Sequence, residues 1–190
     1  MNKRDFTPGV ILLLTVFAAP WAQAADINAG KTKAAACQGC HGVNGVSNNP
    51  LWPSLAGQTS AYLENQLKHF KSGQRENATM NAMAKDLTEA DIQNLAAYFA
   101  SLPGKSAGGD AALAEKGKEK AAMCMGCHGQ TFKGNGQFPK LAGQHPDYLA
   151  KQLLAYKAGE RKAGPMNALA KSLDDDDIKA LAEYLGSLKE

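Results

Sequence analysis

The sequence predicts an all-α protein made of two tandem copies of one small helical domain. A long pattern of residues recurs at an offset of 86 or 87 positions, which is typical of a duplicated unit. Apolar residues recur at helical spacing in both copies. Alternation of apolar and polar residues is scarce and β-branched residues are few, so no strand is predicted.

The repeat extends over most of each copy. Its best-matched parts are a C-x-x-C-H motif, a P-x-L-A-G-Q segment and a methionine followed by asparagine and alanine. The offset is 87 residues at the cysteines and 86 from the prolines onward, so the second copy lacks one residue between His128 and Pro139. The matched segments begin at Cys37 and Cys124, at Pro53 and Pro139, and at Met80 and Met166.

The first 24 residues have the pattern of a cleaved secretory signal peptide. Lys3 and Arg4 precede an apolar run over residues 10–19, and the small residues Ala22 and Ala24 mark a cleavage site. The run is too short to span a bilayer, which needs about 20 apolar residues, and no later run is long enough. We expect cleavage after Ala24 and export to the periplasm; an uncleaved N-terminal anchor is the alternative.

The remaining chain divides into two domains. A stretch rich in Pro, Gly and Ser separates the copies, which places the first domain at residues 25–103, a linker at 104–110 and the second domain at 111–190. Each copy has only about 80 residues and can bury little apolar surface. A staple such as a metal, a disulfide or a large apolar cofactor is therefore expected.

The clearest helices lie at the end of each copy. Thr88 is a good N-cap and Asp91 stands where a capping-box acid is found, so a helix is predicted over residues 88–102. In the second copy Asp174 can cap the matching helix. The acids at 175–177 indicate a solvated helix start rather than a calcium site, because negative charge stabilises the positive end of the helix dipole.

Two glycines recur near the start of the copies. Gly30 and Gly117 each lie seven residues before the first cysteine, in segments rich in Ala and Lys that are predicted to be short helices. Glycine inside a helix costs stability. Its recurrence therefore indicates close contact with another element.

The two C-x-x-C-H motifs predict the covalent attachment of two haem c groups. Two thiols on one helical turn match the separation of the two vinyl groups along one edge of the porphyrin. The histidine that follows is then placed to bind the iron from one face. The residues concerned are Cys37, Cys40 and His41 in the first copy and Cys124, Cys127 and His128 in the second.

Three other uses of the cysteines fit less well, although an exported chain would normally form disulfides. Disulfides within each motif would close very short loops and leave both histidines unexplained. A thioredoxin-like site expects a βαβ context, which the sequence lacks. A zinc site would combine Cys and His ligands at other spacings and would require the two copies to interlock.

The second axial ligand of each iron must come from a residue well separated from the histidine. In the second copy the only methionine downstream of the motif is Met166, which follows a Gly-Pro pair and is expected in a loop. Its repeat partner in the first copy is Met80. Met83 is a rival, but it matches Leu169, an ordinary core residue, so the repeat favours Met80.

Ligation by histidine and methionine raises the reduction potential of a haem and occupies both axial positions. This argues for electron transfer and against peroxide or oxygen chemistry, so we do not expect an enzyme. The other two histidines, His69 and His145, have no counterpart in the opposite copy and are expected to be ordinary surface residues.

These motifs resemble those of the class I c-type cytochromes, over nearly all of both copies, and the tandem arrangement resembles the dihaem cytochrome c4 group. The resemblance implies a small helical fold around each haem, with the two domains facing each other through their haem-propionate edges. It also implies that the carbonyls of Pro53 and Pro139 accept hydrogen bonds from the rings of His41 and His128, which orients the ligand.

The resemblance has two further consequences for packing and cofactor binding. Gly30 is expected to pack near Tyr98 of the terminal helix, and Gly117 near Tyr184. Two arginines and two tyrosines are candidates to bind the propionates, with surface salt bridges and helix packing as the alternative: Arg75, Arg161, Tyr62 and Tyr148.

The resemblance implies a periplasmic electron carrier between a quinol-oxidising bc-type complex or a dehydrogenase and a terminal oxidase or reductase. The alternatives are a haem enzyme of the dihaem peroxidase or thiosulfate dehydrogenase type, or the electron-accepting subunit of a larger dehydrogenase. The formal net charge of +3 at pH 7 is too small to suggest a nucleic-acid partner. We expect weak, salt-sensitive docking to redox proteins.

Overall fold

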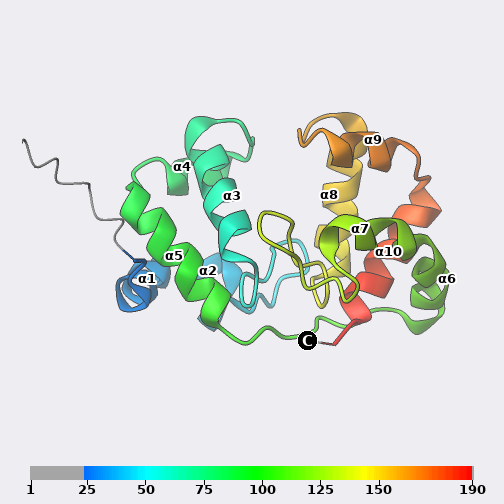
Figure 1. The fold of residues 1–190 in the computed structure, drawn as a ribbon, viewed down its shortest axis with the longest axis horizontal. Coiled ribbons are helices and arrows are strands. Elements are labelled where there is room, and N and C mark those ends of the chain that lie inside the picture. Colours follow the sequence, from blue (N-terminus) through cyan, green and yellow to red (C-terminus); the bar gives the residue numbers. More distant parts are fainter. Residues whose placement is uncertain (1–23, 190) are drawn as a thin grey trace, which may run out of the picture.

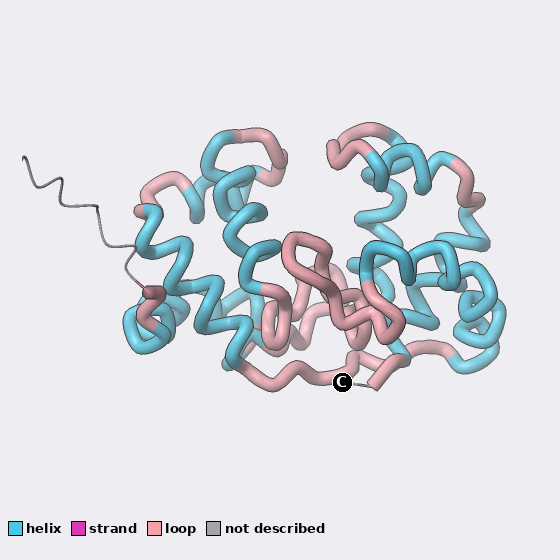
Figure 2. Tube along the Cα trace, viewed as in Figure 1, coloured by secondary structure: helices cyan, strands magenta, loops and turns pink. Residues whose placement is uncertain are grey.

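The computed structural model describes residues 24–189, which are helical without any strand (Figures 1 and 2). An isolated β-bridge joins Asn135 and Phe138. No helix within this described range is long and apolar enough to cross a membrane. Apart from Ala24, the predicted signal peptide lies outside the described residues.

The helices form two sets in the same order, one for each copy of the repeat. This confirms the predicted fold class, two helical domains in tandem. The first set is α1 (Ile27–Ala34), a 3₁₀ turn (Ala35–Cys37), α2 (Gln38–His41), a 3₁₀ turn (Val43–Gly45), α3 (Ser60–Ser72), α4 (Ala78–Ala84) and α5 (Glu89–Ser101). The second set is α6 (Ala111–Ala121), a 3₁₀ turn (Ala122–Cys124), α7 (Met125–His128), α8 (Pro146–Ala158), α9 (Pro165–Lys171) and α10 (Asp175–Ser187).

In each set the first helix packs against the last, and a glycine lies where they cross. A Cβ atom added to Gly30 would lie 2.9 Å from the Cβ of Tyr98 and closer still to the backbone of α5. A Cβ atom added to Gly117 would lie 2.0 Å from the carbonyl oxygen of Ala180 on α10, one turn before Tyr184. Any side chain would push the helices apart, which explains why a residue unfavourable in helices recurs there.

The terminal helices begin at the predicted caps. The hydroxyl of Thr88 accepts a hydrogen bond from the N–H of Asp91 at 3.0 Å, and the carboxylate of Asp91 accepts one from the N–H of Thr88 at 2.9 Å. The carboxylate of Asp174 accepts from the N–H of Asp177 at 2.7 Å. The helix predicted over residues 88–102 is confirmed to within one residue at each end.

The two small cores place an aromatic ring at different positions of the repeat. In the first set Gly45 leaves room for Phe99 of α5, because a Cβ there would lie 2.8 Å from the ring. The matched loop residue in the second set is Phe132, which is almost fully buried, while Leu185 replaces Phe99 on the helix. Gly45 and Phe132 have φ values of 72° and 56°, a conformation that favours glycine, so the buried ring of Phe132 is placed at some cost in backbone strain.

The two sets lie side by side (Figure 1). The pair α3 and α4 faces the pair α8 and α9, and the loops that follow the cysteine motifs meet in the middle. The linker runs along one edge and is bonded to the second set. The N–H of Ala107 donates to the carbonyl of Gly143 at 2.9 Å, and the hydroxyl of Ser106 donates to the carbonyl of Gly186 at 2.9 Å.

Replacing Gly117 by Ala is expected to destabilise the second domain by about 1–3 kcal/mol, because the new methyl group overlaps the backbone of α10. Thermal unfolding followed by circular dichroism measures the effect. Gly126→Ala is the matched control, since an added Cβ there meets nothing within 4 Å. Equal melting temperatures for the two variants would contradict the close crossing of α6 and α10.

Candidate haem sites

Each C-x-x-C-H motif lies in one continuous stretch of helix. Cys37 ends a 3₁₀ turn, and Cys40 and His41 follow in the single turn of α2; the second copy repeats this arrangement with α7. The structure therefore presents both thiols and the imidazole from one short segment. All four cysteines are free. Burial, followed by the neighbouring Cys40, raises the pKa of Cys37, so this thiol is held in its neutral form.

The histidines are buried and each is fixed by one hydrogen bond. The Nδ1 atom of His41 lies 2.9 Å from the carbonyl oxygen of Pro53, and that of His128 lies 2.8 Å from the carbonyl oxygen of Pro139. A carbonyl oxygen can only accept, so Nδ1 carries the proton and Nε2 keeps its lone pair. Burial lowers the pKa of both rings, partly opposed by these bonds, which favours the neutral imidazole that a metal requires.

An aromatic residue precedes each of the two prolines, and the sequence reasoning missed both. Trp52 is 42% exposed and Phe138 is 38% exposed, although large aromatic side chains are usually well covered. The Phe138 ring meets the His128 ring edge-on at 6.4 Å between centroids. Their shared place in the repeat was the signal that could have identified them. A flat apolar cofactor bound at the histidine would find apolar surface here.

The methionines predicted as ligands lie in the first turn of short helices. Met80 is on α4 and Met166 is on α9, and both are half-buried, whereas Met83 is 47% exposed. The expectation that Met166 lies in a loop was wrong. Pro165 occupies the first position of a helix, where its missing N–H costs nothing and its fixed φ suits the helix.

The residues at both motifs fit covalently attached haem. Each motif offers two free thiols, one buried imidazole with an available Nε2, and apolar surface beside it. Within residues 24–189, no three His, Cys, Asp or Glu side chains come together as they do around a protein-bound metal ion. The assignment of Met80 and Met166 as axial ligands stays a prediction.

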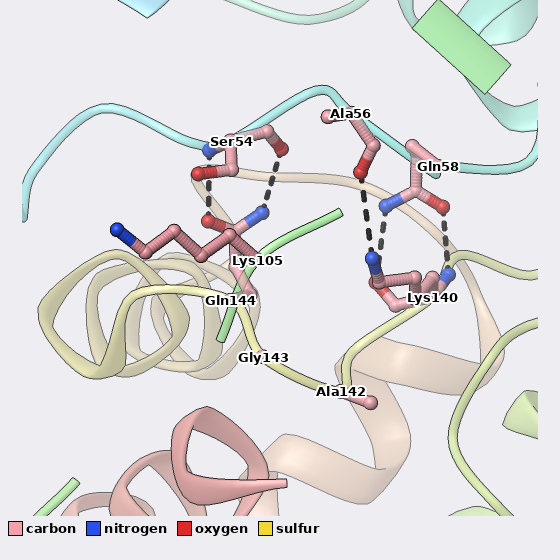
Figure 3. Close-up of a pocket in the computed structure, with 8 residues that line it drawn as sticks. All are labelled: Ser54, Ala56, Gln58, Lys105, Lys140, Ala142, Gly143 and Gln144. Carbon is pink, nitrogen blue, oxygen red and sulfur yellow. Dashed lines mark hydrogen bonds between the residues drawn. The ribbon is translucent and has the colours of Figure 1, made fainter. Parts of the chain in front are cut away.

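Two glutamines clamp the domains together at matched positions (Figure 3). The side chain of Gln144 accepts from the N–H of Ser54 at 2.9 Å and donates to the Ser54 carbonyl at 2.9 Å. Gln58, its repeat partner, accepts from the N–H of Lys140 at 2.7 Å and donates to the Lys140 carbonyl at 3.0 Å. Ser54 and Lys140 are themselves repeat partners, so the interface is reciprocal. The repeat marks both glutamines as matched residues, and only the structure shows that they join the domains.

Two arginines form a second reciprocal set across the interface. Arg75 donates to the side chains of Tyr148 and Gln152 of the other domain at 3.1 and 2.8 Å. Arg161 donates to Tyr62 and Gln66 of the first domain, both at 2.9 Å. Every acceptor that the described residues give these guanidinium groups is a neutral amide or phenol oxygen, so the expected alternative of surface salt bridges is not what the structure shows.

The paired positive charges affect the pKa values of two nearby tyrosines. Burial by itself would raise the pKa of Tyr62, but the charges of Arg161 and Arg75 lower it. The guanidinium carbon of Arg161 lies over the ring of Tyr156, 4.6 Å from the ring centroid. Burial raises the pKa of the Tyr156 phenol to about 12. Among residues 24–189 no carboxylate pairs with either of these two cations, so the interface is suited to anionic groups. Propionate binding by these arginines and tyrosines remains a prediction.

His145 is a correction to the sequence analysis. Its Nε2 atom lies 2.9 Å from the carbonyl oxygen of Ser47 in the other domain, so it is an interface residue rather than an ordinary surface histidine. Its side chain is half-buried. Its repeat partner Thr59 has a buried hydroxyl without a hydrogen-bond partner among the described residues. The second domain therefore contacts the first through His145, and within the described chain the first domain makes no matching hydrogen bond through the Thr59 hydroxyl.

Comparisons with known proteins agree with this geometry. The sequence pattern of the cytochrome c family matches residues 27–103 and again residues 114–189. Cytochrome c4 of Stutzerimonas stutzeri is 38% identical over 204 residues, covering 94% of this chain and 97% of that protein. The crystal structure of reduced recombinant cytochrome c4 from Pseudomonas stutzeri matches with a TM-score of 0.82 at 38% identity, covering 87% of this chain and 100% of that one.

A further relative carries a different name. A protein of Thiomonas intermedia (strain K12), named thiosulfate dehydrogenase electron acceptor, is 35% identical over 203 residues. The match covers 97% of this chain and 94% of that protein. Likeness over nearly the full length therefore extends to a protein named for accepting electrons from a thiosulfate dehydrogenase.

Replacing Gln144 by Ala is expected to lower the free energy of unfolding by about 1–3 kcal/mol, because the N–H and carbonyl of Ser54 lose their partner at the interface. Chemical denaturation measures this, and small-angle X-ray scattering should show a larger radius of gyration if the domains separate. Gln130→Ala, at an exposed position of the same domain, is the control. Identical unfolding of both variants would contradict the clamp.

Proposed function

The chain belongs to the cytochrome c family, with two tandem domains that bind two haem c groups covalently, and on this premise we propose that it is a periplasmic carrier of single electrons. It takes electrons from a quinol-oxidising bc-type complex or a dehydrogenase and delivers them to a terminal oxidase or reductase. The observation that carries the proposal is the presence, in both domains, of a free cysteine pair beside a buried histidine oriented by a proline carbonyl.

Each protein residue has a defined part in this function. Cys37 and Cys40 hold the first haem, and His41 fills one axial position through Nε2 while Pro53 fixes the ring. Met80 supplies the second axial ligand. Bound haem supplies an iron that changes its charge by one electron, and a soft thioether ligand raises its reduction potential.

The second domain uses its repeat partners in the same roles. Cys124 and Cys127 hold the haem, His128 is oriented by Pro139, and Met166 completes the axial pair. The exposed fraction of Met83, together with its match to the core-packing Leu169, supports Met80 over Met83 in the first domain. Filling both axial positions leaves no site for a substrate, which supports a carrier rather than an enzyme.

The interface arginines suit the electron-transfer role. We assign Arg75 and Arg161, with Tyr62 and Tyr148, to the propionates of the two haems. The support is that the two guanidinium groups are partly buried and contact only neutral acceptors in the described chain. Even a partly buried cation without a counter-charge loses hydration, so anionic groups at this interface would stabilise the pairing of the domains.

A second candidate is the electron acceptor of a thiosulfate-oxidising dehydrogenase. The full-length likeness to the Thiomonas intermedia protein of that name favours it specifically. The two candidates share the haem sites and differ in the donor. Rapid reduction of the oxidised protein by a thiosulfate dehydrogenase, compared with reduction by a quinol-oxidising complex, would separate them. A donor that reduces the protein at least tenfold faster than the other identifies the role.

Spectra of the purified protein test the ligand assignment. We expect two haems per chain in a pyridine haemochrome assay and a near-infrared sulfur-to-iron band in the oxidised protein. Met166→Ala and Met80→Ala should each remove about half of that band, because each removes the ligand of one of two haems.

The matched control for this test is Met83→Leu, which should leave the band intact. Loss of half the band in Met83→Leu, with no change in Met80→Ala, would show that Met83 is the methionine ligand in the first domain. Carbon monoxide binding by the unmodified reduced protein at neutral pH would argue for an open site and hence for a haem enzyme.

A further inference from the structure

An asparagine follows each predicted methionine ligand, and its side-chain amide makes three hydrogen bonds. The Nδ2 of Asn81 donates to the carbonyl oxygens of Phe70 at 2.6 Å and Arg75 at 2.9 Å. Its Oδ1 accepts from the N–H of Asn77 at 2.7 Å. One side chain thus joins the end of α3, the arginine-bearing turn and the residue before α4.

The second domain has the same three bonds. The Nδ2 of Asn167 donates to the carbonyls of Tyr156 and Arg161, both at 2.7 Å, and its Oδ1 accepts from the N–H of Ala163 at 2.7 Å. These bonds form although the chain enters the two helices differently. The asparagine, rather than the approach to the helix, is the feature that both domains share.

The residues just before α4 and α9 stabilise the starts of these two helices to different extents. In the first domain the side chain of Asn77 caps α4 by accepting from the N–H of Met80 at 2.9 Å. In the second domain Gly164 precedes Pro165 without any side-chain cap. Both helices have only seven residues, too few to be stable by helix propensity alone. Their position therefore depends on bonds to the rest of the domain.

We propose that Asn81 and Asn167 are positioning residues that hold Met80 and Met166 at the iron. This inference rests on the proposed methionine ligation. The clamp lies one residue from each ligand, so it limits how far the thioether can move away from the metal. Its loss should make the iron–sulfur bond easier to displace, while the haem stays attached through its cysteines.

The test is an imidazole titration of the full-length oxidised protein with both haems, followed by the near-infrared sulfur-to-iron band. In Asn167→Ala, half of the band should disappear at an imidazole concentration about tenfold lower than in the unmodified protein, and the other half at the unmodified concentration. A tenfold change matches about 1.4 kcal/mol, within the range for losing buried hydrogen bonds. Asn81→Ala should show the same change in the other half of the band.

Two further variants keep the test decisive. Asn94→Ala removes an asparagine of α5 whose side chain accepts from the N–H of Asp26 at the start of α1, and it should titrate like the unmodified protein. Asn167→Asp keeps the size of the side chain and one acceptor oxygen but removes both donated bonds. Asn167→Asp should reproduce the tenfold change. If Asn167→Ala fails to incorporate haem, the imidazole titration of Asn167→Asp tests the proposal in its place.

The outcomes against the proposal are distinct from one another. A lower melting temperature in Asn167→Ala and Asn167→Asp, with an unchanged imidazole titration, would make the asparagine merely structural and overturn the inference. Absence of the sulfur-to-iron band in the unmodified protein, or its persistence in Met166→Ala, would instead overturn the methionine ligation on which the inference depends.

Discussion

Each half of this molecule depends on one hydrogen bond, from the ring of a buried histidine to the carbonyl oxygen of a proline. The bonds at His41 and His128 are 2.9 and 2.8 Å long and are the same in both domains. Because they fix the proton on Nδ1, they determine which nitrogen can bind a metal. They also join the cysteine turn to the loop carrying the exposed aromatic residue, so the attachment point and its apolar cover are positioned together.

Duplication of the chain makes the interface between the domains possible. Gln58 binds the backbone of Lys140 as Gln144 binds the backbone of Ser54, so each domain presents the same surface to the other. Self-complementary surfaces of this kind are characteristic of symmetric dimers. Here both copies lie on one chain, and the linker keeps their effective concentration high. Pairing also encloses positive charge, which favours anionic groups between the domains.

The two domains are similar without being equal, and the differences lie close to the haem sites. The ring of Phe132 replaces that of Phe99 in the second core, and it does so from a loop with strained backbone. His145 reaches Ser47 across the interface, whereas its partner Thr59 makes no such bond among the described residues. The turns before the two methionines are also held differently. Such differences give the two irons different surroundings, and surroundings tune reduction potential.

The sequence by itself determined the helical class, the duplication, the attachment motifs and the capped terminal helices, because these depend on spacing and on local hydrogen bonds. Thr88 with Asp91 and the paired Cys-x-x-Cys-His segments needed no knowledge of distant contacts. Only the tertiary structure revealed the glutamine clamps, the crossed arginines, the role of His145 and the helix that carries Met166. The clamps, the arginines and His145 join residues some 70 to 100 positions apart, and no local pattern records which surfaces of two folded copies will meet.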